Sequence, residues 1–366
     1  MTADGDVQPA PAHLANNLDF MRFAAALAVL ISHCYPISGQ QFDFLQHWTG
    51  WLTLGGVAVD VFFIMSGFLI AQSWARDPNA FRFLRNRALR ILPALYVLIL
   101  VSYLIVGPVL TELPLAAYFS GDNIAGTLSQ FGVFWLKDYV PGVFAHNVLP
   151  GDFNGSLWTI PLEVLCYLVA LALGLLGLFS SRWTATAAAV ATFGLYVYCA
   201  YFMAADHVLL NMSARQMTGN AAFFFAGSAL FFWWPSLPKL HGIYGLIGMA
   251  TLLALGGFRA PVALHLLLPF LVMSMALHPT RRLSKFGARG DYSYGIYLYA
   301  FPVSQAVMYF LGPAVTLPGL MVLSVVGTMI CAVLSWRFVE APSLKLKRYG
   351  FPVVASRGNA HRHAQA

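Results

Sequence analysis

The sequence predicts an all-α membrane protein with about ten transmembrane helices and both termini in the cytoplasm. Of its 366 residues, 59% are hydrophobic and only 10% are charged, whereas about a quarter of the residues in soluble domains are charged. Apolar stretches of about 20 residues, the length needed to cross a bilayer, recur along the chain. Basic residues lie mainly in alternate segments between these stretches, which is the pattern that sets membrane topology.

The apolar stretches define ten predicted spans. In chain order they cover residues 18–36, 53–74, 91–110, 156–179, 183–204, 219–235, 240–257, 261–278, 291–312 and 316–338. We therefore predict one transmembrane domain over 18–338, a disordered N-terminal tail of residues 1–17 and a basic cytoplasmic tail of residues 339–366. The first seventeen residues contain two acids and no Lys or Arg, so they lack the basic start of a signal peptide.

The basic residues fix the orientation of these spans. Seventeen of the 21 Lys and Arg fall on the side that carries the N-terminus. The segments on that side are 75–90, 180–182, 236–239, 279–290 and the tail after 338, with Arg337 at its edge. Excess positive charge marks the cytoplasmic side. We expect a multi-pass membrane protein with this orientation.

Composition also excludes other classes of protein. The net charge of +7 is explained by topology, so no nucleic-acid partner is expected. The four cysteines are scattered through apolar sequence without a CxxC spacing, so no metal site or disulfide framework is predicted.

The first span contains two residues that are costly inside hydrocarbon, Arg22 and His33. Intramembrane titratable groups are functional-site candidates by default. Their spacing of eleven residues separates them by roughly 16 Å along a helix. Arg22 is therefore expected near the cytoplasmic face, and His33 in the outer half of the membrane.

Two acids are predicted at the depth of His33. Asp60 and Glu163 each lie about seven residues into their spans from the outer face. One polar cluster would result, in which a carboxylate orients the imidazole or raises its basicity. The alternative is that all three residues form structural pairs between helices.

A basic cluster precedes the third span, in FRFLRNRALRILPALY. Its arginines include Arg87 and Arg90. Arginine forks suit phosphates, so a phosphorylated donor could dock here, although cytoplasmic loops often look the same without binding anything.

The longest loop, residues 111–155, lies on the outer side and is rich in Gly, Pro, Asp and aromatic residues. Its length favours a functional loop, and we expect short helices in it. Trp158 follows this loop, and the segment 291–302 of the ninth span contains four tyrosines, among them Tyr297.

Six ordered blocks of the sequence resemble the acyltransferase-3 family of bacterial membrane-bound O-acyltransferases. The resemblance covers roughly residues 16–345. The blocks read LDFMRFAAALAVLISH, GGVAVDVFFIMSGFLI, FLRNRALRILPALY, GSLWTIPLEVLCYL, SYGIYLYAFP and WRFVEAP.

The resemblance implies transfer of an acyl group, commonly acetyl, from cytoplasmic acyl-CoA to a hydroxyl of a saccharide or glycoconjugate. In the family, an Arg-x10-His pair and an Arg-x-x-Arg pair are regarded as functional. These pairs correspond here to Arg22 and His33 and to Arg87 and Arg90. The three arginines would bind the donor, which is a substrate and not a permanently bound cofactor.

His33 would act as general base or as transient acyl carrier, and both roles stay open. Asp60 or Glu163 would set its tautomer. Trp158 and Tyr297 are assigned to the acceptor site. The acceptor could belong to a lipopolysaccharide O-antigen, an exopolysaccharide or another glycoconjugate.

The chain departs from the family in two respects. Many members have a histidine in the ninth span where this chain has Ala300, so its chemistry cannot depend on a histidine there. Some members carry an appended hydrolase-like domain, whereas this chain resembles the stand-alone form. It would complete the transfer itself or pass its product to glycan-assembly proteins.

Two other functions are compatible with the same residues. Intramembrane Asp, Glu and His also mark proton relays, so a transporter of a small solute or an acyl intermediate is the main alternative. A regulatory subunit with an inactive site is the second, and the intact Arg22, His33, Arg87 and Glu163 argue against it.

Overall fold

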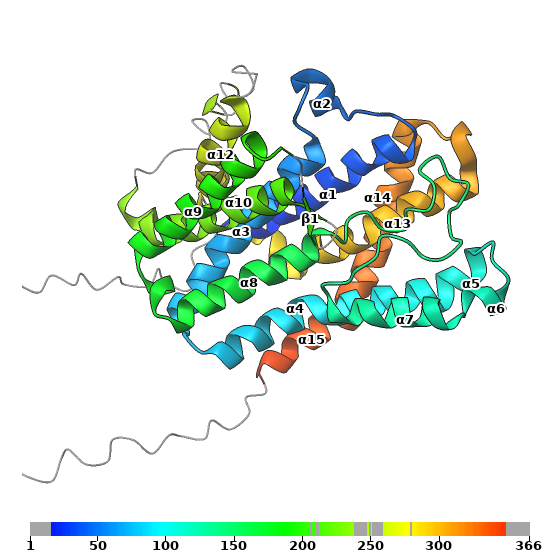
Figure 1. Ribbon diagram of the computed structural model, residues 1–366, viewed down its shortest axis with the longest axis horizontal. Coiled ribbons are helices and arrows are strands. Elements are labelled where there is room, and N and C mark those ends of the chain that lie inside the picture. The colour runs from blue at the N-terminus through cyan, green and yellow to red at the C-terminus, as the bar shows by residue number, and fades with distance from the viewer. Residues whose placement is uncertain are drawn as a thin grey trace, which may run out of the picture.

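The computed structural model describes residues 16–204, 207–209, 212–237, 247–248, 250, 259–278 and 280–348. The chain is mainly helical (Figure 1). The long helices are α1 (Leu18–Ile37), α3 (Leu54–Arg76), α4 (Ala80–Val101), α8 (Thr159–Leu175), α9 (Arg182–Tyr201), α10 (Ala214–Trp233), α12 (Arg259–Leu277), α13 (Ser293–Leu311) and α14 (Leu317–Ser335).

Shorter elements connect or extend these helices. The short α-helices are α2 (Phe44–Thr49), α5 (Gly107–Leu110), α6 (Leu115–Tyr118), α7 (Gly121–Ser129) and α15 (Ala341–Lys345). The π and 3-10 segments are η1 (Ser102–Val106), η2 (Gln130–Gly132), η3 (Leu178–Ser180), η4 (Trp234–Ser236), η5 (Leu283–Arg289), η6 (Gly312–Ala314), η7 (Trp336–Glu340) and η8 (Leu346–Arg348). Strands β1 (Val208–Leu209) and β2 (Met212–Ser213) form one antiparallel pair.

Nine of the ten predicted spans overlap these helices, and most of the remaining one, 240–257, lies outside the described residues. Within the described residues, five helices are long and apolar enough to cross a membrane. They are Leu18–Ile37, Leu54–Arg76, Ala80–Leu110, Arg182–Tyr201 and Leu317–Lys345. Thr159–Leu175 and Pro261–Leu277 are apolar but shorter. The chain is therefore an all-α protein of the membrane-embedded type.

The predicted boundaries need two changes. The third span begins eleven residues earlier than predicted, at Ala80, and the basic cluster is thus part of α4. The last helix does not end at 338 but continues through η7, α15 and η8 to 348, where it packs on α4. This contact explains why residues 339–348, the first part of the predicted basic tail, are helical. Residues 1–15 and 349–366 lie outside the described residues.

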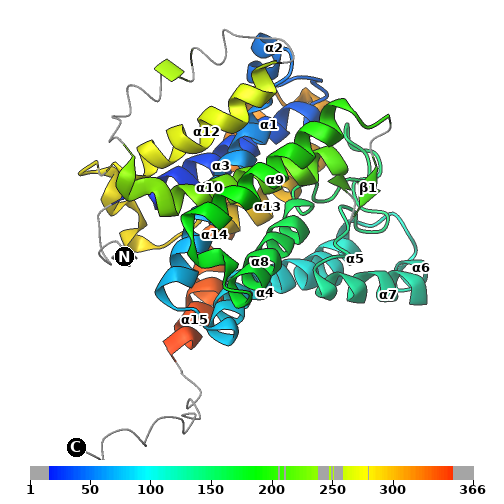
Figure 2. The ribbon, with the colours of Figure 1, turned by 60° about the vertical axis from the view of Figure 1, so that its left-hand side comes forward.

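Helices α9, α10, α3, α1, α13 and α14 pack side by side in that order. Figures 1 and 2 show this row, with α8 and α4 crossing beside it and α12 next to α10. The long element formed by α4 and α5 carries α15 near its first turns (Figure 1). One end of the bundle holds the N-termini of α1, α4 and α13, and we call it the basic end. The other end holds α2 and the N-termini of α3 and α10.

Local capping explains where several helices begin. Asp43 accepts a hydrogen bond from the backbone N–H of Gln46 at 2.9 Å and caps α2. Thr53 and Asn79 cap α3 and α4 in the same manner. Such side-chain caps satisfy amide groups that have no partner within the helix.

Helices α3 and α10 cross at two glycines that allow backbone contact. A Cβ at Gly67 would lie 1.8 Å from the carbonyl oxygen of Phe224, and one at Gly227 would lie 2.1 Å from that of Ile64. The Ser228 hydroxyl donates a hydrogen bond of 3.0 Å to the carbonyl of Gly67. Small residues with a hydroxyl nearby are the usual means of bringing membrane helices close together.

We expect Gly67→Ala to destabilise the protein by at least about 1–3 kcal/mol, because the added methyl group forces the two backbones apart. The measurement is thermal unfolding of the purified protein in detergent. Gly194→Ala is the matched control, since a Cβ at this exposed position of α9 meets nothing within 4 Å. Equal melting temperatures for the two variants would contradict the close crossing.

Candidate active site

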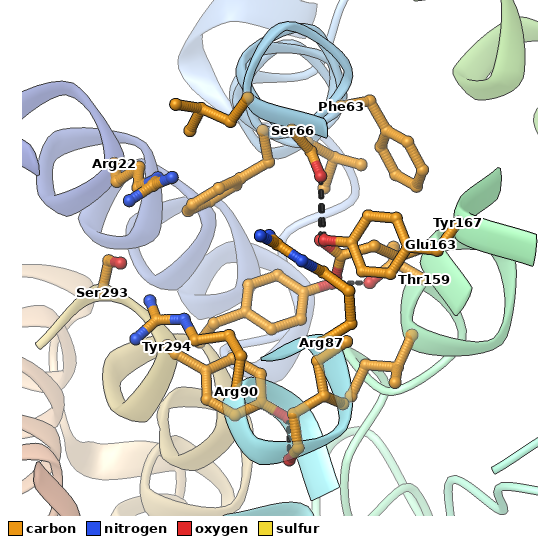
Figure 3. A pocket seen from close by; sticks show the side chains of 16 residues that line it. Arg22, Phe63, Ser66, Arg87, Arg90, Thr159, Glu163, Tyr167, Ser293 and Tyr294 are labelled. Atoms are coloured by element: carbon orange, nitrogen blue, oxygen red, sulfur yellow. Dashed lines mark hydrogen bonds between the residues drawn. The ribbon is translucent and has the colours of Figure 1, made fainter. Parts of the chain in front are cut away.

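Three arginines converge on a cavity of about 120 Å³ at the basic end. We call it the arginine pocket. Arg22 reaches it from α1, and Arg87 and Arg90 from successive turns of α4. Figure 3 shows the three guanidinium groups pointing into the space between these helices. The structure therefore brings together the three residues that the sequence assigns to donor binding.

Asp291, just before α13, connects two of these arginines. Its Oδ2 lies 2.5 Å from Nη2 of Arg90 and 3.4 Å from Nη1 of Arg22. Burial alone would raise the pKa of the Asp291 carboxyl, but the charges of Arg90 and Arg22 and two hydrogen bonds from Ser293 hold it well below its usual range. Glu340 of η7 lies 3.9 Å from Arg90. The charge of Arg90 is thus shared between two carboxylates.

Arg87 has no such partner within the described part of the chain. Its only hydrogen bond there is a long one, 3.4 Å, to the Ser73 hydroxyl, and its Nε is buried without a partner. The guanidinium lies 5.9 Å from the ring centres of Phe83 and Tyr167. A partly buried cation without an ion-pair partner has the chemistry to bind an anion.

Lys347 adds to the positive potential beside Arg87. It lies in η8, beyond the last apolar helix, and its backbone carbonyl accepts a hydrogen bond of 3.2 Å from Arg85. Burial and the nearby charges of Arg87, Arg90 and Arg85 lower the pKa of Lys347 to about 8. Burial is the larger cause, and repulsion from the three arginines adds to it. An incoming phosphate would relieve the repulsion.

Glu163 belongs to the arginine pocket and does not lie beside His33. One oxygen accepts hydrogen bonds from Ser66, at 3.2 Å, and from Tyr167. Ser66 lies six residues beyond Asp60 on α3, about 9 Å further along the axis. Glu163 and His33 thus line different cavities, and the segment before α8 is already buried at Asn154 and Ser156.

His33 lines a second cavity, of about 340 Å³, toward the other end of the bundle. We call it the histidine pocket. Trp158 and Tyr297, the residues assigned to the acceptor, also line it. The His33 ring packs edge-on against Phe301 at 5.1 Å, and its Nδ1 is buried without a hydrogen-bond partner in the described structure.

Asp60 faces a third cavity, of about 760 Å³, which we call the Asp60 pocket. Successive residues of a helix point about 100° apart, so Asp60 is turned away from the face on which Val59 lines the histidine pocket. The expected single cluster of His33, Asp60 and Glu163 does not form, since the three side chains line three different cavities.

Sequence reasoning overlooked Asp43, which also lines the histidine pocket. Its buried carboxylate accepts hydrogen bonds from the Ser32 hydroxyl at 2.6 Å and from the Leu54 amide at 2.7 Å. It therefore fixes the turn between α1 and α3 beside His33. Its position as the cap of a short helix was a weak signal. Asp291 was also overlooked, although it opens the tyrosine-rich segment that begins the ninth span.

Val59 and Tyr297 line both the arginine pocket and the histidine pocket. The Tyr297 hydroxyl lies 2.6 Å from that of Thr159 and donates to the carbonyl of Ser156 at 2.8 Å. These bonds hold the ring in place between the cavities. Two pockets of different chemistry thus meet at one layer of side chains.

The fold and these cavities define the class of protein. It is a helical, membrane-embedded protein in which a cation-lined pocket and a histidine pocket share a wall. A family profile described as acyltransferase domain matches residues 15–337. The chain belongs to this family, as the sequence motifs indicate.

Several characterised proteins are similar to the chain. The O-acetyl transferase of Shigella phage Sf6 is 32% identical over 336 residues, covering 90% of this chain and 96% of the phage protein. Nodulation protein 10 of Rhizobium leguminosarum bv. viciae is 30% identical, covering 91% of this chain and 94% of that protein. The peptidoglycan O-acetyltransferase OatA of Listeria monocytogenes is 26% identical, covering 92% of this chain but 56% of its own length. No solved structure matches significantly.

We expect Asp291→Asn to destabilise the protein by about 1–3 kcal/mol, because Arg22 and Arg90 then lose the carboxylate they share. Thermal unfolding in detergent at neutral pH measures the loss of stability. Asp77→Asn is the control, since the Asp77–Arg82 pair is about 40% exposed on both sides and such pairs contribute about 1 kcal/mol or less. A loss no larger than that of the control would contradict the role of Asp291.

Proposed function

We propose that this protein is a membrane-bound O-acyltransferase that moves an acyl group, most simply acetyl, from cytoplasmic acyl-CoA to a hydroxyl of a saccharide or glycoconjugate. Its membership of the acyltransferase family and the printed names of its relatives support acyl transfer to oxygen. The observation that carries the proposal is the shared wall between a cationic pocket and a histidine pocket.

The arginine pocket has the chemistry to receive the phosphates of the donor. Arg87 offers a guanidinium without a carboxylate partner among the described residues, and Lys347 lies in the same positive field. Arg22 and Arg90 are held by Asp291, so we assign them to shaping the pocket as well as to binding. Planar guanidinium groups bind phosphate through paired hydrogen bonds.

The two cavities lie at a separation that a flexible donor can cover. Arg22 and His33 are eleven residues apart on α1, which corresponds to roughly 16 Å. The long pantetheine arm of acyl-CoA would pass between Val59 and Tyr297 and carry the thioester into the histidine pocket. This passage requires the ring of Tyr297 or the side chain of Val59 to move.

His33 is the proton acceptor in the proposed reaction. As a general base it would take the proton of the acceptor hydroxyl, the oxygen would attack the thioester carbonyl, and the CoA thiolate would leave and take up a proton. As a transient carrier it would first bind the acyl group itself and then release it to the hydroxyl. Both routes yield an ester and free CoA.

Trp158 and Tyr297 would position the acceptor in the histidine pocket, because aromatic faces pack well against sugar rings and the tyrosine hydroxyl can form hydrogen bonds. We place the protein in the bacterial inner membrane, with the donor entering at the basic end from the cytoplasm. Its remaining partners would be membrane lipids and the glycan-assembly proteins that supply or use the acceptor.

We expect His33→Ala to abolish acyl transfer while the protein remains in the membrane at normal levels. Mass spectrometry of surface glycans from cells that express each variant would show the loss of the acyl mass increment. His146→Ala is the control, because this exposed histidine pairs with Glu112 and lines neither the arginine pocket nor the histidine pocket. Normal acylation by His33→Ala would refute the assignment, and proton-coupled solute uptake without CoA release would favour a transporter.

We expect Arg87→Met to raise KM for acetyl-CoA roughly ten- to hundredfold, the equivalent of one charge-assisted hydrogen bond. Steady-state CoA release by the purified protein in proteoliposomes gives the value. The control is Arg82→Met, on the same helix but paired with the exposed Asp77. An unchanged KM in Arg87→Met would place the donor elsewhere.

A further inference from the structure

The Asp60 pocket takes no part in the transfer described so far, although it has more than twice the volume of the histidine pocket, about 760 Å³ against 340 Å³. It lies at the end of the bundle opposite the arginine pocket. Three of its lining residues stand at helix ends there: Thr53 caps α3, Tyr201 ends α9, and Gln216 lies in the first turn of α10.

The Asp60 pocket and the histidine pocket adjoin each other. Thr53, Gly56 and Gln216 line both of them. Gly56 has no side chain to fill the junction, and a Cβ there would lie 2.7 Å from the Thr53 hydroxyl. A molecule bound beside His33 would therefore have the larger space directly next to it.

The larger pocket combines flat aromatic side chains with hydrogen-bonding groups. Trp51 and Tyr196 supply the aromatic surfaces, and Arg215 and Gln216 supply polar groups. The Asp60 carboxylate also faces the cavity, and within the described part of the chain it makes no hydrogen bond or ion pair. A carboxylate in such surroundings needs a donor, and neighbouring sugar hydroxyls are suitable donors.

We infer that the acceptor is an oligosaccharide, bound with its reacting sugar in the histidine pocket and with at least one neighbouring sugar in the Asp60 pocket. This inference rests on the proposed acyl transfer and adds the length of the acceptor. Asp60 then acts as a binding residue that accepts hydrogen bonds from the second sugar. Trp51 provides a face on which a sugar ring can pack.

Purified protein in proteoliposomes provides the test, with acetyl-CoA as donor. The acceptors are fragments of one, two and four sugars, cut from the surface glycan whose acylation is lost in His33→Ala cells. Wild-type protein should have a kcat/KM at least about tenfold higher for the tetrasaccharide than for the single sugar, mainly through KM. Trp51→Ala and Asp60→Asn should each reduce the ratio of kcat/KM for the tetrasaccharide to kcat/KM for the single sugar severalfold. Trp51→Phe should reduce this ratio less.

Trp48→Ala is the matched control. This tryptophan is 84% exposed and lines neither pocket, so its variant should keep the wild-type ratio. The milder Trp51→Phe variant and a size-exclusion profile separate lost binding from lost folding. Equal kcat/KM for all lengths in the wild-type protein, or an unchanged ratio in both Trp51→Ala and Asp60→Asn, would overturn the inference.

The same measurements distinguish this inference from the proposed function. Transfer to the single sugar with no gain for longer fragments would leave acyl transfer standing and remove the extended subsite. A gain only for fragments that keep a lipid anchor, and not for longer free sugars, would assign the Asp60 pocket to a lipid headgroup and overturn the oligosaccharide.

Discussion

The electrostatic clamp around Asp291 is the interaction on which the basic end of the structure depends. One carboxylate joins Arg22 of α1 to Arg90 of α4, at the point where α13 begins. Charges buried in an apolar bundle are costly unless they are paired. The clamp thus permits several cations to face one cavity, and Glu340 ties the end of α14 to the same group. The position of Arg87 follows, because it projects from the helix that the clamp holds.

The second constraint is the close packing of α1 and α3 with their neighbours. Gly67 and Gly227 bring α10 onto α3, and Asp43 fixes the turn from α1 to α3 through Ser32 and Leu54. The rotation of α3 about its axis is set in this way. That rotation decides which cavity each of its residues faces, and it turns Asp60 away from Val59.

Much of the fold could be predicted from the sequence because apolar length alone locates most of the helices. The convergence of Arg87 and Arg90 was also predictable, since residues three apart share a helix face. The spacing of Arg22 and His33 placed them at different depths for the same reason. Contacts between segments far apart in the chain were not predictable in this way. Asp291 is 269 positions from Arg22, and no local pattern relates them.

Counting residues from the ends of the spans did not reveal which cavities Glu163 and Asp60 line, each for a specific reason. The segment before α8 enters the interior in an irregular conformation, with Asn154 donating to the carbonyl of Leu298, so the start of the helix does not mark the membrane surface. For Asp60, counting placed the residue at the level of the histidine pocket but did not show which way its side chain points. The sequence of α3 is apolar on every face, and such a pattern does not reveal the rotation of a helix about its axis.

The wall formed by Val59 and Tyr297 has a consequence for the cell. A bundle hollowed from both ends is separated into two compartments there by a single layer of side chains. In the proposed reaction this layer would have to open far enough for an acyl chain and still prevent protons and ions from crossing, because a persistent gap would dissipate the membrane potential. The hydrogen bonds that Tyr297 forms with Ser156 and Thr159 would then seal the membrane as well as support the ring. Selection on this residue would reflect the integrity of the membrane as much as the rate of the reaction.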